Sequence, residues 1–326
     1  MKKEKLVNLL KTLKSFKPKV LVIGDLMLDS YIYGDVNRIS PEAPVPILNF
    51  EHQRETLGGS GNVVSNLINF GANVEIASII GNEMAGDIVI SKLKDISVSS
   101  NFIIRSKSVN TTKKTRYVSG ISQLLRLDND SDGIALNELN RLEKKIKSSS
   151  KNFDCIIISD YNKGLCQKSF LENIISFFKK KSVPIFVDPK GKSWIKYKGI
   201  NCITPNILEL ETEMNITLKS DSDFEKSGYD IVKKLKLESC LITRGADGMT
   251  YVSSHEVIHQ KINPVEVFDV SGAGDTVITS FALSRLQGYT TKECLAIASF
   301  ASSEVVKYTG TTPFNFNMVY YVQDEK

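Results

Sequence analysis

The chain has 326 residues, of which 41% are hydrophobic and 24% are charged, and its net charge is +5. This composition is typical of a globular protein, and the scattered lysines fall short of the clustered basic surface that binds nucleic acid. No run of about 18 apolar residues could span a membrane, and the basic N-terminus lacks the apolar segment of a signal peptide. Five widely spaced cysteines indicate reduced thiols. We therefore expect a cytoplasmic protein that binds neither nucleic acid nor membranes.

The first third of the chain mixes helical periodicity with β-like alternation. The patterns predict a helix at 3–16, a strand at 19–23, a helix from 63 to 70 that ends at Gly71, a strand at 74–80 and a helix at 85–93. The segments 30–50 and 100–127 read instead as short β-like pieces, and three prolines exclude a long helix from the first of them. We expect these two inserts to form one small β-sheet lid.

The rest of the chain alternates helices and strands regularly. Helices at 135–148, 168–180 and 223–236 each precede a short strand rich in Ile, Val or Phe, at 155–159, 185–187 and 240–243. Such an alternation is typical of an α/β fold with a largely parallel central sheet and helices on both faces. Because no repeat or linker is visible, we expect a single domain over 1–326 that carries the lid.

The string Asp269-Val-Ser-Gly-Ala-Gly-Asp275 runs into an apolar, helix-competent segment that reaches Gly288. Gly272, Ala273 and Gly274 form a small-residue turn at a helix start, where unpaired N–H groups and the helix dipole favour an anion. Asp275 lies at the rim, where a carboxylate could take a proton from a hydroxyl that attacks a bound phosphate. The pattern indicates phosphoryl transfer, and the alternative is a helix cap after a glycine turn.

Two further strings follow apolar strands. In Thr204-Pro-Asn206-Ile-Leu-Glu209, Asn206 and Glu209 share one side of a helix start, a spacing that also suits a simple capping box. In Thr243-Arg244-Gly245-Ala-Asp-Gly248, the glycines are equally consistent with a turn between two strands.

Together, these strings resemble the signatures of the ribokinase-type (PfkB) sugar kinases. The resemblance implies a ribokinase-like fold, ATP as the phosphate donor, and Asp275 as the catalytic base. It places Asn206 and Glu209 near Mg²⁺ and the ATP phosphates, largely through water, with Thr243, Arg244, Gly245 and Gly248 beside the nucleotide. It also implies a sugar site at Asp25, Gly58, Gly59 and Asn62, where directed polar groups and closely approachable glycines suit a ligand with many hydroxyls.

Longer strings resemble one group in that family, the heptose-7-phosphate 1-kinases of ADP-heptose synthesis, which occur alone or fused to an adenylyltransferase. They are Gly24–Tyr31, Arg38–Pro46, Gln123–Asp128, Ser159–Gly164 and Asp188–Gly191. The chain departs from the group at Ser60-Gly61, where alanines are usual, and in the flanks of Arg116. Both departures touch the sugar side, so the alternatives are a kinase of fructose, ribose or fructose 6-phosphate, or a sugar-binding module without catalysis.

A sugar phosphate needs cations at its far end. Arg116, Arg126, Lys163 and Lys190 are the candidates, because Arg forks match phosphate oxygens and Lys supplies a compact charge. Asp160 and Lys163 are well placed, since open α/β sheets bind ligands beyond the carboxyl ends of their strands. The resemblance further implies a possible homodimer through the β-lid.

Overall fold

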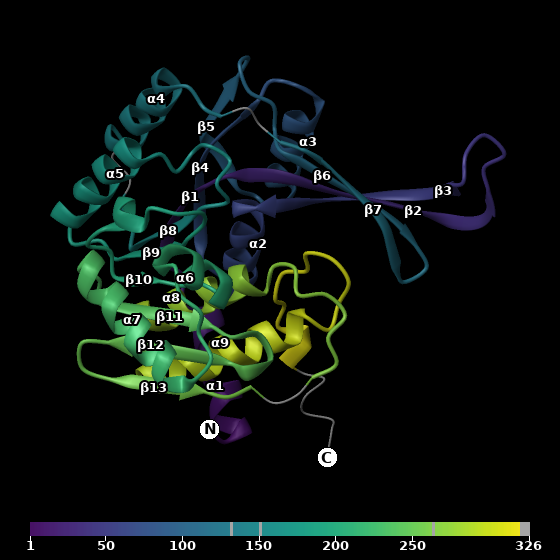
Figure 1. Cartoon of the computed structure of the whole chain (residues 1–326). Coiled ribbons are helices and arrows are strands. Elements are labelled where there is room, and N and C mark those ends of the chain that lie inside the picture. The colour runs from purple at the N-terminus through teal and green to yellow at the C-terminus, as the bar shows by residue number, and fades with distance from the viewer. Residues whose placement is uncertain (131–132, 150–151, 263–264, 320–326) are drawn as a thin grey trace.

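The computed structural model describes residues 1–130, 133–149, 152–262 and 265–319. Its centre is a nine-stranded sheet in the order β13-β12-β11-β10-β9-β8-β1-β4-β5 (Figure 1). The pairs from β11 through β5 are parallel, and β12 and β13 pair antiparallel at one edge. The strands are β1 (Lys19–Gly24), β4 (Asn73–Gly81), β5 (Ser99–Ser106), β8 (Cys155–Ser159), β9 (Ile185–Asp188), β10 (Cys202–Ile203), β11 (Ser239–Thr243), β12 (Met249–Ser253) and β13 (Val257–Gln260).

Helices cover both faces of this sheet, as the strand composition predicts. One face packs against α1 (Lys3–Ser15), α2 (Ser60–Phe70), α3 (Met84–Asp95), α8 (Ala273–Leu286) and α9 (Thr291–Val305). The other packs against α4 (Leu136–Lys147), α5 (Lys168–Lys180), α6 (Ile207–Met214) and α7 (Asp221–Leu235). Val20 and Val22 point into the first core and Leu21 and Ile23 into the second, which is why β1 is apolar at nearly every position.

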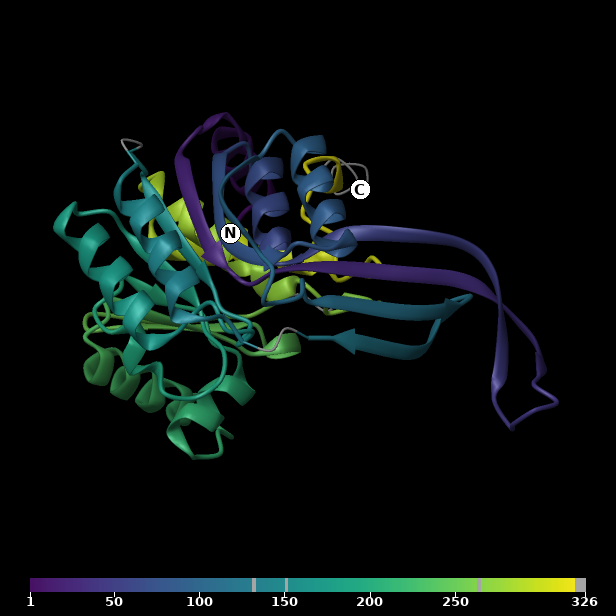
Figure 2. The same ribbon diagram turned by 90° about the horizontal axis from the view of Figure 1, so that it is seen from above.

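A second, four-stranded sheet projects sideways from the body as the lid (Figure 2). Its order is β3-β2-β6-β7, and its strands are β2 (Leu26–Ile39), β3 (Pro46–Gly59), β6 (Lys113–Ser119) and β7 (Ser122–Asn129). The first insert is longer than the expected 30–50, because β2 and β3 pair as one hairpin of two 14-residue strands. The second insert is shorter than the expected 100–127, because β5 pairs with β4 at the edge of the large sheet.

The lid is joined to the body with almost no intervening chain. Only Asp25 separates β1 from β2, and β3 runs from Gly59 straight into Ser60, the first residue of α2. The backbone N–H of Ser60 also donates to the carbonyl of Asp25 at 3.0 Å, which ties the two junctions together. The base of the lid is therefore continuous with β1 and α2.

Most predicted elements are confirmed to within one or two residues at each end. The Thr243–Gly248 string forms the turn between two strands that was the alternative there, because β12 follows it and pairs antiparallel with β11. The helix α9 and the strand β13 lie outside the predictions. All five cysteines are buried and unpaired, which confirms the reduced thiols. Among the described residues, no helix is both long and apolar enough to cross a membrane.

Candidate active site

The candidate residues gather at one edge of the large sheet, where five parallel strands end. The strands β1, β8, β9, β10 and β11 are neighbours in the sheet, and each ends just before or at a polar residue. Those residues are Asp25, Asp160, Asp188, Thr204 and Arg244. Since parallel strands share one carboxyl edge, the topology alone brings together positions that are far apart in sequence.

The helix α8 begins at this edge with the small-residue turn. Gly272 has a φ of 84°, and a Cβ there would lie 2.5 Å from Nδ2 of Asn62, so only glycine fits. Within the described part of the chain, the N–H groups of Gly274 and Asp275 have no hydrogen-bond partner. They open onto a pocket of about 260 Å³ that Gly272, Gly274 and Asp275 help to line. This arrangement suits an anion.

Asp275 is almost fully buried at the rim of that pocket, with 2% of its surface exposed. Asn62 Nδ2 donates to its Oδ2 at 2.7 Å, and the Tyr161 hydroxyl lies 2.9 Å from Oδ1 and 3.1 Å from Oδ2. Burial raises the pKa of Asp275 to about 6, although these two donors and Lys114 act in the opposite direction. A carboxylate with a pKa near neutrality is suited to accept a proton from a hydroxyl.

A larger pocket of about 690 Å³ lies beside the first one and shares Asn206, Thr243, Val270 and Gly274 with it. Gly245 and Gly248 form part of its wall, and valines supply much of the remainder: Val265, Val267, Val270, Val277 and Val306. The apolar wall suits a flat heterocycle, with its phosphates directed toward α8.

Arg244 belongs to the larger pocket but its guanidinium is engaged elsewhere. Its Nη1 lies 2.7 Å from Oδ1 of Asp221, and its Cζ lies 4.2 Å from the ring centroid of Phe224. The guanidinium is thus held against α7.

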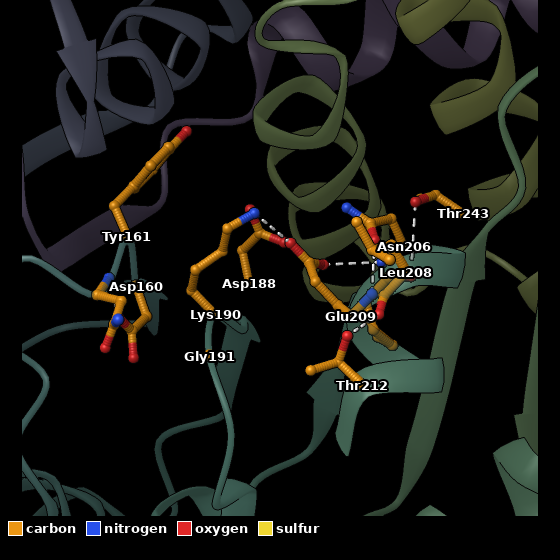
Figure 3. Close-up of polar contacts among 12 residues, drawn as sticks. Asp160, Tyr161, Asp188, Lys190, Gly191, Asn206, Leu208, Glu209, Thr212 and Thr243 are labelled. Atoms are coloured by element: carbon orange, nitrogen blue, oxygen red, sulfur yellow. Dashed lines mark hydrogen bonds and ion pairs between the residues drawn. The ribbon is translucent and has the colours of Figure 1, made fainter. Parts of the chain in front are cut away.

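Asn206 and Glu209 form the capping box that the spacing allows. Asn206 Oδ1 accepts from the Glu209 N–H, and Glu209 Oε2 accepts from the Asn206 N–H, both at 2.9 Å. The other carboxylate oxygen of Glu209 lies 2.7 Å from Nζ of Lys190 (Figure 3). Both acidic side chains, Glu209 and Asp188, line the smaller pocket. Burial and the negative charges of Glu209 and Asp275 raise the pKa of Asp188 well above its usual range.

Asp25 and Asp160 hold the loop that follows β8. Asp25 accepts hydrogen bonds from the N–H groups of Tyr161, Lys163 and Leu165, at 2.9, 3.1 and 3.2 Å. Burial and the nearby Asp160 raise the pKa of Asp25 to about 6. Asp160 in turn pairs with Lys196 at 2.6 Å and accepts from the hydroxyl of Tyr197. Both carboxylates therefore shape the backbone of the loop.

The two glycines predicted for the sugar site, Gly58 and Gly59, lie at the base of the lid, Gly58 beside Asp29 and Gly59 beside Asp25 and Met27. A Cβ on Gly58 would lie 2.4 Å from Asp29 Oδ2, so the buried Asp29 carboxylate requires glycine there. Asp29 also accepts a hydrogen bond from Thr311 Oγ1 at 3.0 Å.

Each of the four predicted phosphate-binding cations lies in an ion pair. The pairs are Arg116–Asp29 at 2.8 Å, Arg126–Asp128 at 2.8 Å, Lys163–Asp130 at 2.6 Å and Lys190–Glu209 at 2.7 Å. Lys190 therefore lies at the smaller pocket beside Glu209, whereas Arg116 and Arg126 lie in the lid.

Four residues near the pocket were not candidates from the sequence: Asp29, Lys114, Tyr161 and Asp188. Asp29, Tyr161 and Asp188 lie within strings that the resemblance already marks, so a local signal existed for them. Lys114 has no such signal, because it reaches the site only through the pairing of β6 with β2.

Comparison with known proteins agrees with this geometry. The chain matches the model of the pfkB family carbohydrate kinases over residues 17–316. It is 37% identical over 297 residues to the bifunctional protein HldE of Desulfatibacillum aliphaticivorans, covering 90% of this chain and 60% of that protein. It is 36% identical over 307 residues to the bifunctional protein HldE of Aliarcobacter butzleri, covering 94% and 64%. The chain thus spans less than two thirds of the length of these relatives.

Solved structures share the fold at lower sequence identity. Phosphofructokinase-2 from Escherichia coli, in complex with potassium, superposes with a TM-score of 0.79 at 20% identity, covering 94% of this chain and 98% of that one. Ribokinase from Arabidopsis thaliana, with ribose and ATP, gives a TM-score of 0.72 at 17% identity, covering 95% and 100%. The ribokinase-like fold is confirmed. The chain belongs to the pfkB family of carbohydrate kinases and is an ATP-dependent phosphotransferase.

Proposed function

We propose that the protein transfers the γ-phosphate of ATP to the anomeric hydroxyl of D-glycero-D-manno-heptose 7-phosphate. The product is the 1,7-bisphosphate, a precursor for ADP-heptose and the lipopolysaccharide core. The observation that carries the proposal is the buried carboxylate of Asp275 beside the open N-terminus of α8. The motif strings shared with heptose-7-phosphate kinases, and the relatives named HldE, support the choice of sugar.

In the proposed reaction, the anomeric hydroxyl gives its proton to Asp275 as its oxygen attacks the γ-phosphorus. The bond from that phosphorus to the β–γ bridging oxygen breaks, and ADP leaves. The backbone N–H groups of Gly274 and Asp275, which have no hydrogen-bond partner among the described residues, stabilise the charge on the transferred group. The N–H of Ala273, by contrast, already donates to the carbonyl of Val270 at 3.2 Å. Asn62 holds the carboxylate of Asp275 in place.

The donor set on the nucleotide side fits Mg²⁺. Asp188 and Glu209 supply carboxylate oxygens at the same pocket. Burial and, after it, the negative charges of Glu209 and Asp275 raise the pKa of Asp188, and a divalent cation would offset those charges. Mg²⁺ keeps several of its waters, so two carboxylates are sufficient. When bound, the ion offsets the charge of the β- and γ-phosphates. Lys190, paired with Glu209, is placed to hold the same phosphates.

The direct test is to incubate the purified protein with ATP, Mg²⁺ and a panel of sugar phosphates and free sugars, and to follow ADP. The proposal expects the highest kcat/KM with heptose 7-phosphate and almost none with Asp275→Asn. A higher value for fructose, ribose or fructose 6-phosphate would replace the proposed substrate but keep the reaction. Sugar binding without any turnover would instead indicate a binding module.

We also infer that the lid can form a homodimer contact. Leu125 and Leu127 of β7 are 60% and 55% exposed, and they lie on the lid face opposite to that of Lys114. Burying such apolar residues against a second lid would be favourable. Size-exclusion chromatography with light scattering of the wild type and of Leu125→Asp tests this, and a wild type that is monomeric at all concentrations contradicts it.

A further inference from the structure

The hydroxyl of Tyr161 is directed at the catalytic carboxylate. Oδ2 of Asp275 is approached by two donors, Asn62 and Tyr161, whereas Oδ1 is approached by Tyr161 alone. A carboxylate has about four lone-pair sites. Oδ1 therefore keeps one accepting site, which is where a third donor, the hydroxyl of a sugar, can bind.

Tyr161 is held in this position by the surrounding protein. Its backbone N–H donates to Asp25 at 2.9 Å, and the Lys114 ammonium of the lid lies 5.7 Å from its ring centroid. Its side chain points away from that of the adjacent Asp160, which is anchored in the body beneath the loop (Figure 3). The backbone, the ring and the hydroxyl of Tyr161 are thus each held by a protein contact.

We propose that Tyr161 is a positioning residue for the general base. Its hydroxyl fixes the rotation of the Asp275 carboxylate, so that the free site of Oδ1 faces the acceptor hydroxyl, and it keeps the carboxylate ionised. The inference rests on the proposed role of Asp275 as the base, and it adds a residue from the loop after β8 to the catalytic geometry.

The electrostatics of the site agree with this role. Burial and the charges of Asp275 and Asp188 raise the pKa of Tyr161 well above its usual value, so its hydroxyl remains a donor. The groups that face Asp275 are Asn62 of α2, Asp29 of β2, Lys114 of β6 and Tyr161 itself, with Asp188 of β9 across the pocket. Hydrogen bonds from Asn62 and Tyr161 favour the charged carboxylate, as does Lys114, whereas Asp29 opposes it.

Removing the hydroxyl should therefore raise the pKa of Asp275 above its value of about 6. Loss of one hydrogen bond to a charged group corresponds to a shift of about one pH unit, or about tenfold in proton affinity. In Tyr161→Phe, the acidic limb of the kcat/KM profile should move from near pH 6 to near pH 7. The loss of activity should be several-fold greater at pH 6 than at pH 9, because a deprotonated base is regained at high pH.

Tyr197→Phe is the matched control. Tyr197 is fully buried, whereas Tyr161 is partly buried, and Tyr197 also donates to a carboxylate, that of Asp160, but it does not contact Asp275. The Tyr197→Phe variant should have a lower melting temperature and leave the acidic limb of the kcat/KM profile unmoved. If Tyr161→Phe lowers kcat/KM equally at every pH, or if the acidic limb of its kcat/KM profile does not move, the inference is overturned. If Asp275→Asn stays active, the proposed function fails instead. If Asp275→Asn is inactive and the acidic limb of Tyr161→Phe does not move, only the proposed role of Tyr161 fails.

Discussion

Replacing Lys114 by methionine should weaken the binding of a phosphorylated sugar far more than that of the same sugar without its phosphate. The reason is the register of the lid. Residues directly opposite on paired strands point to one face, and so do residues two apart along a strand. The register gives a first row of Thr56, Asp29, Lys114 and Asp128 and a second row of Arg54, Tyr31, Arg116 and Arg126. We call these eight residues the inner face of the lid.

The inner face is cationic and is directed at the site. It carries four cations and two carboxylates, an excess of two positive charges that matches a phosphate monoester of charge about −1.5 to −2. Burial lowers the pKa of Lys114 although the charges of Asp29 and Asp128 act in the opposite direction. These two carboxylates therefore do not fully offset the cost of burying the Lys114 ammonium. Within the described residues, neither Lys114 nor Arg54 has an ion pair.

The position of the two rows also suits the length of a sugar. Lys114 of the first row lies over Tyr161, which contacts Asp275. The second row lies about 7 Å further along the strands, from a rise of about 3.3–3.4 Å per residue. A sugar with its anomeric hydroxyl at Asp275 can therefore direct a distal phosphate toward the inner face.

A charge-assisted contact to phosphate is worth about 1.5–3 kcal/mol, or roughly ten- to a hundredfold in affinity. We expect Lys114→Met to raise the Kd of heptose 7-phosphate by that factor and to change the Kd of unphosphorylated heptose little. The kcat should fall with both sugars, because Lys114 also favours the charged form of Asp275. Calorimetric titration and steady-state kinetics with both sugars measure this.

Lys113→Met is the control, because Lys113 is one residue away, lies on the opposite face and contacts Glu55 at 3.7 Å. An equal loss of affinity for both sugars in Lys114→Met would refute the reasoning. So would an equal loss of affinity for heptose 7-phosphate in Lys114→Met and Lys113→Met. Arg126→Met and Lys163→Met extend the same comparison to the other candidate cations.

Three further variants test other parts of the site. Asp275→Asn should reduce kcat by about 10²–10⁴-fold and leave the Kd of ATP unchanged, and retention of more than about a tenth of the wild-type kcat would exclude Asp275 as the base. Glu209→Gln should raise the Mg²⁺ concentration for half-maximal rate, and an unchanged Mg²⁺ dependence would leave Glu209 as a helix cap only. Lys196→Met should lower the free energy of unfolding by about 3–5 kcal/mol, because it leaves the buried Asp160 without its cation; a urea titration measures this, and an unchanged midpoint would contradict it.

The sequence was informative wherever structure is decided locally. The turn at Gly272 and the helix after it could be predicted, because small residues and an apolar run are local signals. The helix α9 has such a local signal too, because Thr290 and Glu293 form a capping box before an apolar segment. The antiparallel strands β12 and β13 differ, because the α/β alternation predicts only parallel neighbours.

The parts of the site that escaped prediction depend on distant pairing. Lys114 reaches the pocket because β6 pairs in one particular register with β2, and a shift by one residue would send it to the opposite face. The Tyr161 hydroxyl meets Asp275 across 114 positions of sequence. Neither contact can be predicted from the residues around it, although Tyr161 itself lies in the string Ser159–Gly164 that the resemblance marks. The motifs could indicate a base and an anion site, but not Tyr161 and Lys114, which affect the pKa of that base.

The short junctions between lid and body restrict how such a lid can vary. Because only Asp25 lies between β1 and β2, and none between β3 and α2, an inserted or deleted residue at the base would displace Asn62 and, with it, Asp275. The tip at 40–45, by contrast, is exposed for most of its length and contacts no catalytic group. Insertions are tolerated best at such exposed tips. The lid can therefore change in length at its tip while Asn62 and Asp275 keep their positions.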